Sequence, residues 1–271
     1  PTDEFDAYVR ASYGNYNTSE LEGAIGGRVD KALAVRFSGI LQHRDDYVDN
    51  GFTGEKDAYE GFDEWGARAQ FLFTPFDNDF SALLNVHARD NESSARLFRA
   101  NIIDPGSNGG GANFDRDTGF FDGGNQDLEQ EAFGVTLTLE KSLSDAVDLT
   151  YIYGRETAEV FSRGDIDGGF GAAFLGAGNF GPGFIPFPSE SAGGVDDLTQ
   201  VTHEARLAFD NGGAVRAQAG LFSFSEDVQI TSLSFDSLAP GQPENGRASR
   251  AQDSDSFGIF ASVSYDVTDR L

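Results

Sequence analysis

A small set of arginines and one phenylalanine offers the clearest binding chemistry in this sequence. The chain holds 45 Asp and Glu residues against 19 Lys and Arg residues, so clustered guanidinium groups stand out. Arginine suits carboxylate and phosphate groups because its planar guanidinium donates paired hydrogen bonds. The residues that we predict to contact a ligand are Arg89, Arg96, Phe98, Arg99, Arg116 and Arg163.

The arginines and the phenylalanines of this prediction each have an alternative role. The arginines could pair with neighbouring acids such as Asp90, Asp115 and Asp117 instead of with a ligand. Phenylalanines could form an aromatic surface for a bulky ligand, or they could pack within their own loops. These phenylalanines are Phe98, Phe120, Phe121, Phe170, Phe174 and Phe180.

Catalytic and metal-binding patterns are weak throughout the chain. His43, His87 and His203 are the three histidines, and no pair of them has ligand spacing. Three acid groups could attract calcium, but none completes a calcium loop: Asp45 and Asp46 with Asp49, Asp165 with Asp167, and Asp253 with Asp255. The sequence contains no nucleophile-elbow pattern, and Gly109–Gly111 lacks the Lys-Ser/Thr of a phosphate loop. We therefore predict no catalytic residue, no metal, no cofactor and no enzymatic activity.

Composition excludes some partners and leaves others open. The net charge of −26 disfavours nucleic acid, which requires clustered Lys and Arg. It indicates either an acidic face that attracts cationic ligands or adaptation for solubility in an acidic or saline habitat. The mean hydropathy is −0.36, and no apolar run approaches the roughly 20 residues of a membrane helix. A β-barrel remains possible because only alternate residues of its strands face lipid.

Apolar and polar residues alternate with a period of two along ten segments, which predicts ten β-strands. The segments cover about residues 5–13, 21–29, 33–41, 65–73, 80–88, 133–139, 147–153, 201–209, 215–224 and 257–265. On two neighbouring segments the face opposite the apolar one carries Arg68, Gln70, Asn85, His87 and Arg89. Five such groups in a dry core would each need a partner, so they indicate a hydrated interior.

The connections between the segments are of two unlike kinds. Five are short, contain Asp and sometimes Asn or Gly, and have apolar shoulders, which is typical of hairpins. They lie at residues 29–33, 75–80, 143–147, 209–215 and 267–271. Most connections at the other end are long and polar or glycine-rich. The pattern predicts an all-β fold: an antiparallel up-and-down transmembrane β-barrel fragment with short periplasmic turns and long extracellular loops.

Several segments, in this order, resemble TonB-dependent outer-membrane receptors of the proteobacterial type. Residues 13–18 (YGNYNT) and 20–27 (ELEGAIGG) resemble the first barrel hairpin of that family. Residues 33–39 (LAVRFSG) and 44–50 (RDDYVDN) resemble its next strand and the exit from it. Residues 97–103 (LFRANII) and 162–169 (SRGDIDGG) are similar to loop segments of family members. The resemblance spans nearly the whole chain and is strongest before residue 103.

The resemblance implies a barrel in the cell outer membrane that takes up a scarce nutrient of the siderophore, cobalamin or saccharide class. It implies three partners: the small-molecule ligand, outer-membrane lipid, and the TonB complex, reached through an N-terminal plug. Residues 1–271 match only the first ten or so strands of a 22-stranded family barrel, so we expect a partial barrel domain without plug or C-terminal strands. No plug residue can be assigned to any position of this chain.

Two other classes of protein fit parts of the pattern. One is a complete small outer-membrane barrel with a hydrolase site, in which the first and last strands would pair. The other is a soluble acidic calcium-binding β module with a dry core. The receptor interpretation predicts instead a continuous outward band containing Phe37, Phe71, Leu84 and Leu137, and unpaired edges at the first and tenth strands.

Overall fold

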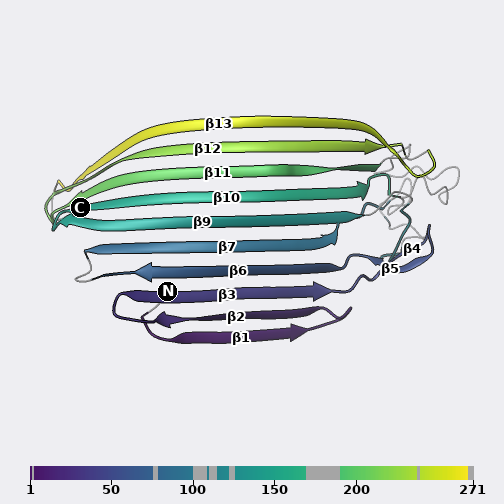
Figure 1. Ribbon diagram of the computed structural model, residues 1–271, viewed down its shortest axis with the longest axis horizontal. Helices are drawn as coiled ribbons and strands as arrows, with labels where there is room; N and C mark the ends of the chain where they lie inside the picture. Colours follow the sequence, from purple (N-terminus) through teal and green to yellow (C-terminus); the bar gives the residue numbers. More distant parts are fainter. Residues whose placement is uncertain are drawn as a thin grey trace.

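The protein is built from β-strands. The computed structural model describes residue 1 and residues 3–75, 79–99, 109, 115–121, 126–168, 190–236 and 239–267. Within these ranges no helix is long and apolar enough to cross a membrane. Ten strands form one antiparallel sheet in which neighbours in space are neighbours in sequence, apart from a small separate sheet (Figure 1).

The ten strands lengthen steadily along the chain, from 8 residues in the first to 22 in the last. Their bounds are β1 (Asp6–Tyr13), β2 (Ser19–Arg28), β3 (Leu33–Arg44), β6 (Phe62–Phe73), β7 (Phe80–Ser94), β9 (Asp127–Ser144), β10 (Val147–Asp165), β11 (Glu190–Asp210), β12 (Val215–Phe235) and β13 (Glu244–Tyr265). A transmembrane strand needs about 9–11 residues. The later strands therefore extend well beyond a bilayer, at the end away from the short turns.

One face of the sheet carries a continuous apolar band, as predicted. Phe71, Leu84 and Leu137 are register partners on β6, β7 and β9, so their side chains share this face. Phe37 on β3 belongs to the same face and meets Phe71 edge-on, with ring centroids 5.8 Å apart. In the described part of the chain, the ten strands pack against their sheet neighbours alone, so no second layer covers the band. The alternative of a soluble module with a dry sandwich core therefore does not fit this sheet.

The opposite face is polar and forms the wall of a hydrated lumen. Arg68 is opposite His87, and Gln70 is opposite Asn85, while Arg89 shares their face. All five residues that were predicted to face water therefore lie together. Side chains pair across this face: Arg89 Nε on β7 lies 3.0 Å from Glu64 on the neighbouring β6, and His87 Nε2 on β7 reaches across β9 to lie 3.2 Å from Glu156 on β10. Such pairing satisfies charge at a position that lipid would not tolerate.

The short turns follow the predicted hairpin chemistry. The Asp30 carboxylate accepts a hydrogen bond from the backbone N–H of Ala32 at 2.7 Å, which closes the turn between β2 and β3. Between β11 and β12, Asp210 accepts a bond from the N–H of Gly212, and Gly212 has a φ of +72° that favours glycine. Parts of the second and fifth predicted turns, residues 76–78 and 268–271, lie outside the described residues.

The sheet does not close on itself. Among the described strands, β1 pairs with β2 alone and β13 pairs with β12 alone. Both outer edges are therefore unpaired, as the receptor interpretation predicts. A complete ten-stranded barrel, in which β1 and β13 would be partners, is not what this chain forms.

Strand lengths are the main correction to the sequence-based expectation. Residues 225–255 were predicted to be a connection, yet most of them belong to β12 and β13, which pair from Val215/Tyr265 up to Phe235/Glu244. The segment 45–63 likewise contains two short strands. Beyond the membrane both faces of a strand meet water, so the alternation of polar and apolar residues is lost while the hydrogen-bonded ladder continues.

Adjacent residues on β9 test the assignment of the two faces. Leu137→Arg puts a charge against lipid and is expected to lower the free energy of unfolding by about 2–4 kcal/mol. Thr136→Arg faces the lumen, where Asn85 and Gly154 are its register partners, and is expected to shift it by less than about 1 kcal/mol. Unfolding of the lipid-embedded protein in denaturant measures both, and equal losses would contradict the assignment.

Candidate ligand-entry site at the outer rim

Two long connections meet at the end of the barrel wall away from the short turns. The connection from β3 to β6 contains β4 (Val48–Asn50) and β5 (Glu55–Tyr59), and the one from β7 to β9 contains β8 (Thr118–Gly119). Together they form a three-stranded sheet of order β5-β4-β8. In Figure 1, β4 and β5 lie at the far end of the wall from the short turns. We call this end the outer rim.

Asn50 joins the two connections. Asn50 is 1% exposed. Its side-chain amide bonds to Phe121 as the backbone of a neighbouring strand would: Nδ2 donates to the Phe121 carbonyl at 2.9 Å, and Oδ1 accepts from the Phe121 N–H at 3.2 Å. Oδ1 also accepts from the N–H of Phe52, and Nδ2 donates to the Tyr59 hydroxyl. Phe121 is buried against the edge of the Tyr59 ring. A single buried amide thereby holds three segments.

Ion pairs fix the base of the small sheet. Asp49 pairs with Lys56 and accepts a hydrogen bond from the N–H of Asp57 at 3.0 Å. The Lys56 ammonium, and then this N–H, lower the pKa of Asp49. Asp45 accepts hydrogen bonds from Asn17 and from His43, and these bonds, the one from Asn17 first, lower the pKa of Asp45. Both carboxylates are thus held in their charged forms.

An aromatic and guanidinium group lies beside them, which we call the rim cluster: Tyr16, Arg44, Tyr47 and Arg116. The rings of Tyr16 and Tyr47 stack with centroids 4.2 Å apart. The guanidinium of Arg44 lies over the Tyr47 ring, 5.2 Å from its centroid. Arg116 is placed next to β4 because the Asp49 N–H donates to the carbonyl of Asp117. Planar rings and guanidiniums can together bind a ligand that is aromatic, anionic or both.

A polar cavity of about 440 Å³ opens between the rim and the ends of β6 and β7. Six acidic residues line it: Asp45, Asp46, Glu55, Asp63, Glu92 and Asp127. The His43 ring lies between Asp45 and Asp63, at 2.9 and 2.7 Å. Part of the chain's large excess of acidic residues is therefore concentrated in this cavity at the rim.

The structure places the six predicted ligand-binding residues in four different parts of the molecule. Arg89 lies in the lumen, and Arg96, Phe98 and Arg99 follow the end of β7, where Phe98 is 48% exposed. Arg116 belongs to the rim cluster and its side chain is 75% exposed. Arg163 lies near the outer end of β10, half-buried against the ring of Phe235.

Three of these arginines pair with acids, as the alternative interpretation anticipated. Arg116 pairs with Asp117 at 3.0 Å, and Arg163 pairs with Glu190 at 2.6 Å. Arg89 pairs with Glu64 and not with its neighbour Asp90, because adjacent residues of a strand point to opposite faces. Of the phenylalanines, Phe121 packs inside the small sheet and offers no ligand surface, while Phe170, Phe174 and Phe180 lie outside the described residues.

The predicted acid pairs do not assemble a metal site within the described ranges, where no group of three or more His, Asp or Glu side chains is arranged to hold an ion. Asp165 and Asp167 are buried at the outer end of β10.

Sequence reasoning missed Tyr16, Tyr47 and Asn50. Their contacts join segments up to 71 residues apart, which periodicity does not reveal. The short strand at residues 48–50 carries no alternation either, because Tyr47-Val48-Asp49-Asn50 has two apolar residues followed by two polar ones.

Comparison with known proteins identifies the fold. No family model and no curated protein matches the sequence. Among solved structures, the chain is similar to the ferripyoverdine receptor of the outer membrane of Pseudomonas aeruginosa, with 13% identity and a TM-score of 0.66, covering 99% of this chain and 36% of the receptor. It is also similar to the ferric yersiniabactin uptake receptor FyuA from Yersinia pestis, with 12% identity and a TM-score of 0.60, covering 99% and 45%. For the closed form of the ferric-catecholate import receptor Fiu from E. coli, identity is 16% and the TM-score 0.63, covering 99% and 40%.

The chain therefore has the fold of an outer-membrane receptor β-barrel, the fold of the TonB-dependent receptors that it resembles. It spans less than half the length of the receptors that it matches. The predicted all-β barrel fold is confirmed.

Removing the Asn50 amide should detach β8 from β4. Asn50→Ala leaves the buried N–H and carbonyl of Phe121 without their partners, which is expected to cost about 1–3 kcal/mol in the stability of the small sheet. Hydrogen exchange at the Phe121 and Phe52 amides measures it. The control is Asn245→Ala, an exposed residue that bonds to Ser234 and should leave these amides unchanged. Unaltered exchange in Asn50→Ala would refute the role of Asn50.

Acid should loosen β4 and β5. Because the folded pKa of Asp49 is lowered, its contribution to stability is present above the ordinary Asp pKa near 4 and is lost as the pH falls through the lower folded value. Hydrogen-exchange protection of residues 55–59 should therefore fall below about pH 4. In Asp49→Asn this part of the pH dependence should disappear, and an identical profile in both proteins would contradict the link.

Proposed function

We propose that this chain forms part of the wall and outer rim of a receptor that takes up a scarce nutrient across the outer membrane, using energy from the TonB complex. The ligand is captured at the rim and passes into the lumen. In this proposal residues 1–271 belong to a larger barrel, and the TonB complex acts through a plug.

The observation that carries the proposal is the combination of a two-faced wall and a constructed rim. An apolar face and a charged, internally paired face indicate lipid on one side and water on the other. At the outer end, the described parts of two long connections are joined by buried hydrogen bonds between Asn50 and Phe121. Long loops that are locally ordered on a rigid scaffold are typical of binding sites.

The nutrient that we favour is a metal complex of the siderophore class. Solved neighbours of this fold include receptors named for ferripyoverdine, ferric yersiniabactin and ferric catecholates. The copper transporter OprC is also similar, with 16% identity and a TM-score of 0.54, covering all of this chain and 36% of the transporter. The neighbours named here are receptors and a transporter, and none is an enzyme. Cobalamin and saccharides are the other substrate classes to test.

Arg116 is the predicted ligand contact with the strongest support. Its guanidinium is exposed at the rim and lies near the stacked Tyr16 and Tyr47 rings. Arg96, Phe98 and Arg99 could add contacts from the adjoining connection, and Arg89 would meet the ligand later, in the lumen. Arg163 is half-buried between Glu190 and Phe235, so its proposed role is the weakest of the six.

Uptake assays test the function. In a strain that lacks its own receptors, the complete protein should support growth on one of a panel of ferric siderophores, copper, cobalamin or oligosaccharides, and deletion of TonB should abolish that growth. Growth that persists without TonB would contradict the proposal, as would growth on none of the panel.

A matched pair of arginine variants tests the binding site. Arg116→Gln removes a guanidinium from the rim cluster and is expected to weaken binding of the transported ligand about tenfold. Arg247→Gln is the control, since Arg247 is equally part of an exposed ion pair, with Glu244, but lies at the start of β13 away from the cluster. Equal affinities for both variants would remove Arg116 from the site.

A further inference from the structure

A hollow of about 370 Å³ lies on the lumen side of the wall, over β1, β2, β3, β6 and β7. Ser38, Arg68 and His87 line it from three neighbouring strands and are register partners, so they share the lumen face. Tyr8 lines it from β1. Arg68 is five residues from Phe73, where β6 ends at a short turn. A transmembrane strand has about 9–11 residues, so the hollow lies below the rim, behind the apolar outer band.

Arg68 is the exception among the arginines of this face. In the described strands β1 to β7, the other lumen-facing arginines each pair with a carboxylate: Arg10 with Glu22, Arg28 with Asp3, Arg36 with Asp6, Arg44 with Glu60 and Arg89 with Glu64. Arg68 is exposed and forms no ion pair with any described residue. The chain has 45 acidic residues against 19 Lys and Arg residues, so scarcity of acids does not explain this.

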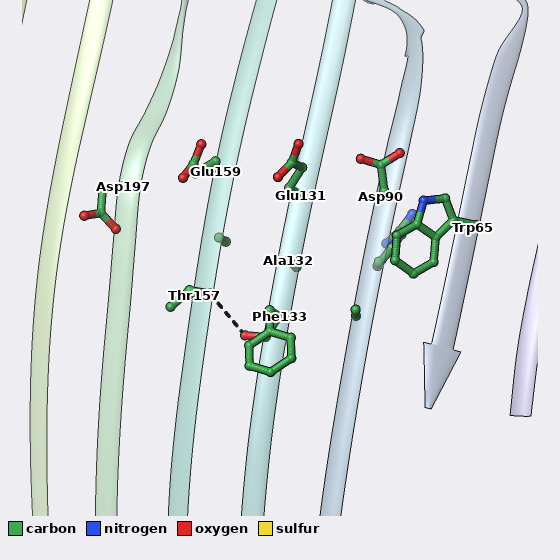
Figure 2. Close-up of a pocket in the computed structure, with 11 residues that line it drawn as sticks. Trp65, Asp90, Glu131, Ala132, Phe133, Thr157, Glu159 and Asp197 are labelled. Carbon is green, nitrogen blue, oxygen red and sulfur yellow. Dashed lines mark hydrogen bonds between the residues drawn. The ribbon is translucent and has the colours of Figure 1, made fainter. Parts of the chain in front are cut away.

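The carboxylates around Arg68 either have other partners or lie on the other side of the wall. On the lumen face of β2 and β6, Glu22 and Glu64 already bind other side chains. Adjacent residues of a strand point to opposite faces, so the neighbouring acids of β7 and β9 are directed away from the lumen. Figure 2 shows four carboxylates on that apolar face, where they cannot reach Arg68: Asp90, Glu131, Glu159 and Asp197.

Two glycines keep the space beside Arg68 open. Gly66 is two residues away on the same face of β6 and lines the hollow without a side chain. Gly134 on β9 lets the His87 ring pass over it to Glu156 on β10, since a Cβ atom at Gly134 would clash with both groups. The ring directly opposite Arg68 is therefore held toward β10, on the far side of β7 from the guanidinium.

We propose that this hollow is a lumen site for a carboxylate, which the Arg68 guanidinium binds through two parallel hydrogen bonds. One free positive charge matches a singly charged carboxylate, whereas a phosphate dianion would also meet the Glu22 carboxylate. Tyr8 and Ile40 border the hollow and would contact the carbon atoms next to the carboxylate. The source that we infer is the nutrient on its way from the rim, and in this the inference rests on the proposed function. An acidic side chain of the receptor itself has the same chemistry, and the experiment separates the two sources.

Chemical labelling of arginine tests the site without any transport. The purified complete protein is treated with phenylglyoxal, which modifies accessible guanidinium groups, and the modification of each arginine is followed by mass spectrometry. We expect Arg68 to be modified readily, and saturating propionate to slow this modification about fivefold, a modest effect because one exposed ion pair is weak. Propionamide, which has the same shape without the charge, should have no effect. Because labelling needs neither TonB nor transport, its outcome is independent of the uptake assay.

Arg206 supplies the matched control, since it lies on the lumen face of β11, pairs with Glu204 and does not line the hollow. Its modification should not respond to propionate. In NMR spectra, Arg68→Gln should abolish the broadening of propionate signals by the protein, and Arg206→Gln should leave it unchanged. Protection of Arg68 before propionate is added, removed by high salt, would support the site but assign the carboxylate to the receptor itself. Modification of Arg68 that neither propionate nor salt alters would overturn the proposal, as would equal broadening by both variants.

Discussion

The hydrogen-bonded ladder between neighbouring strands is the constraint on which the rest of this structure depends. In the hydrocarbon of a membrane, every backbone N–H and carbonyl needs a partner within the protein, so the register between strands is under strict control. Because side chains alternate between faces, a slip of one residue on β9 would place Thr136 against lipid and Leu137 in the lumen. The apolar band, the paired charges of the lumen and the position of the rim all follow from this one register.

The ladder continues beyond the membrane, where the constraint on side chains is different. There β10 to β13 carry acids and hydroxyl groups on both faces, and carboxylates such as Glu131 and Glu159 can even stand opposite each other. The small sheet at the rim uses the same interaction in another form, since the Asn50 amide pairs with Phe121 as a neighbouring strand would. The same kind of backbone pairing between neighbouring segments therefore holds the membrane-spanning part, the projecting wall and the rim, although each part has different surroundings.

This difference explains what could be predicted from the sequence. Within the membrane, alternation identified the strands and their faces, including the polar set around Arg68 and His87. Above it, alternation vanishes, and residues 225–255 were mistaken for a connection although they form most of the outer halves of β12 and β13. The rim depends on contacts between distant segments, such as Tyr16 with Tyr47 and Asn50 with Phe121, for which local pattern holds no information. The partner of Arg89 was missed for a geometrical reason, since Asp90 is adjacent in sequence but lies on the other face.

Site-directed labelling along one strand tests the two-faced wall most directly. The chain contains no cysteine, so single cysteines can be placed at successive positions 133–139 of β9 without background. The account predicts strict alternation in the complete protein embedded in lipid. Probes at 133, 135, 137 and 139 should be quenched by lipid-borne nitroxides, and cysteines at 134, 136 and 138 should react with a water-soluble maleimide. Equal access of the water-soluble reagent to both sets, without a period of two, would contradict a wall between lipid and lumen.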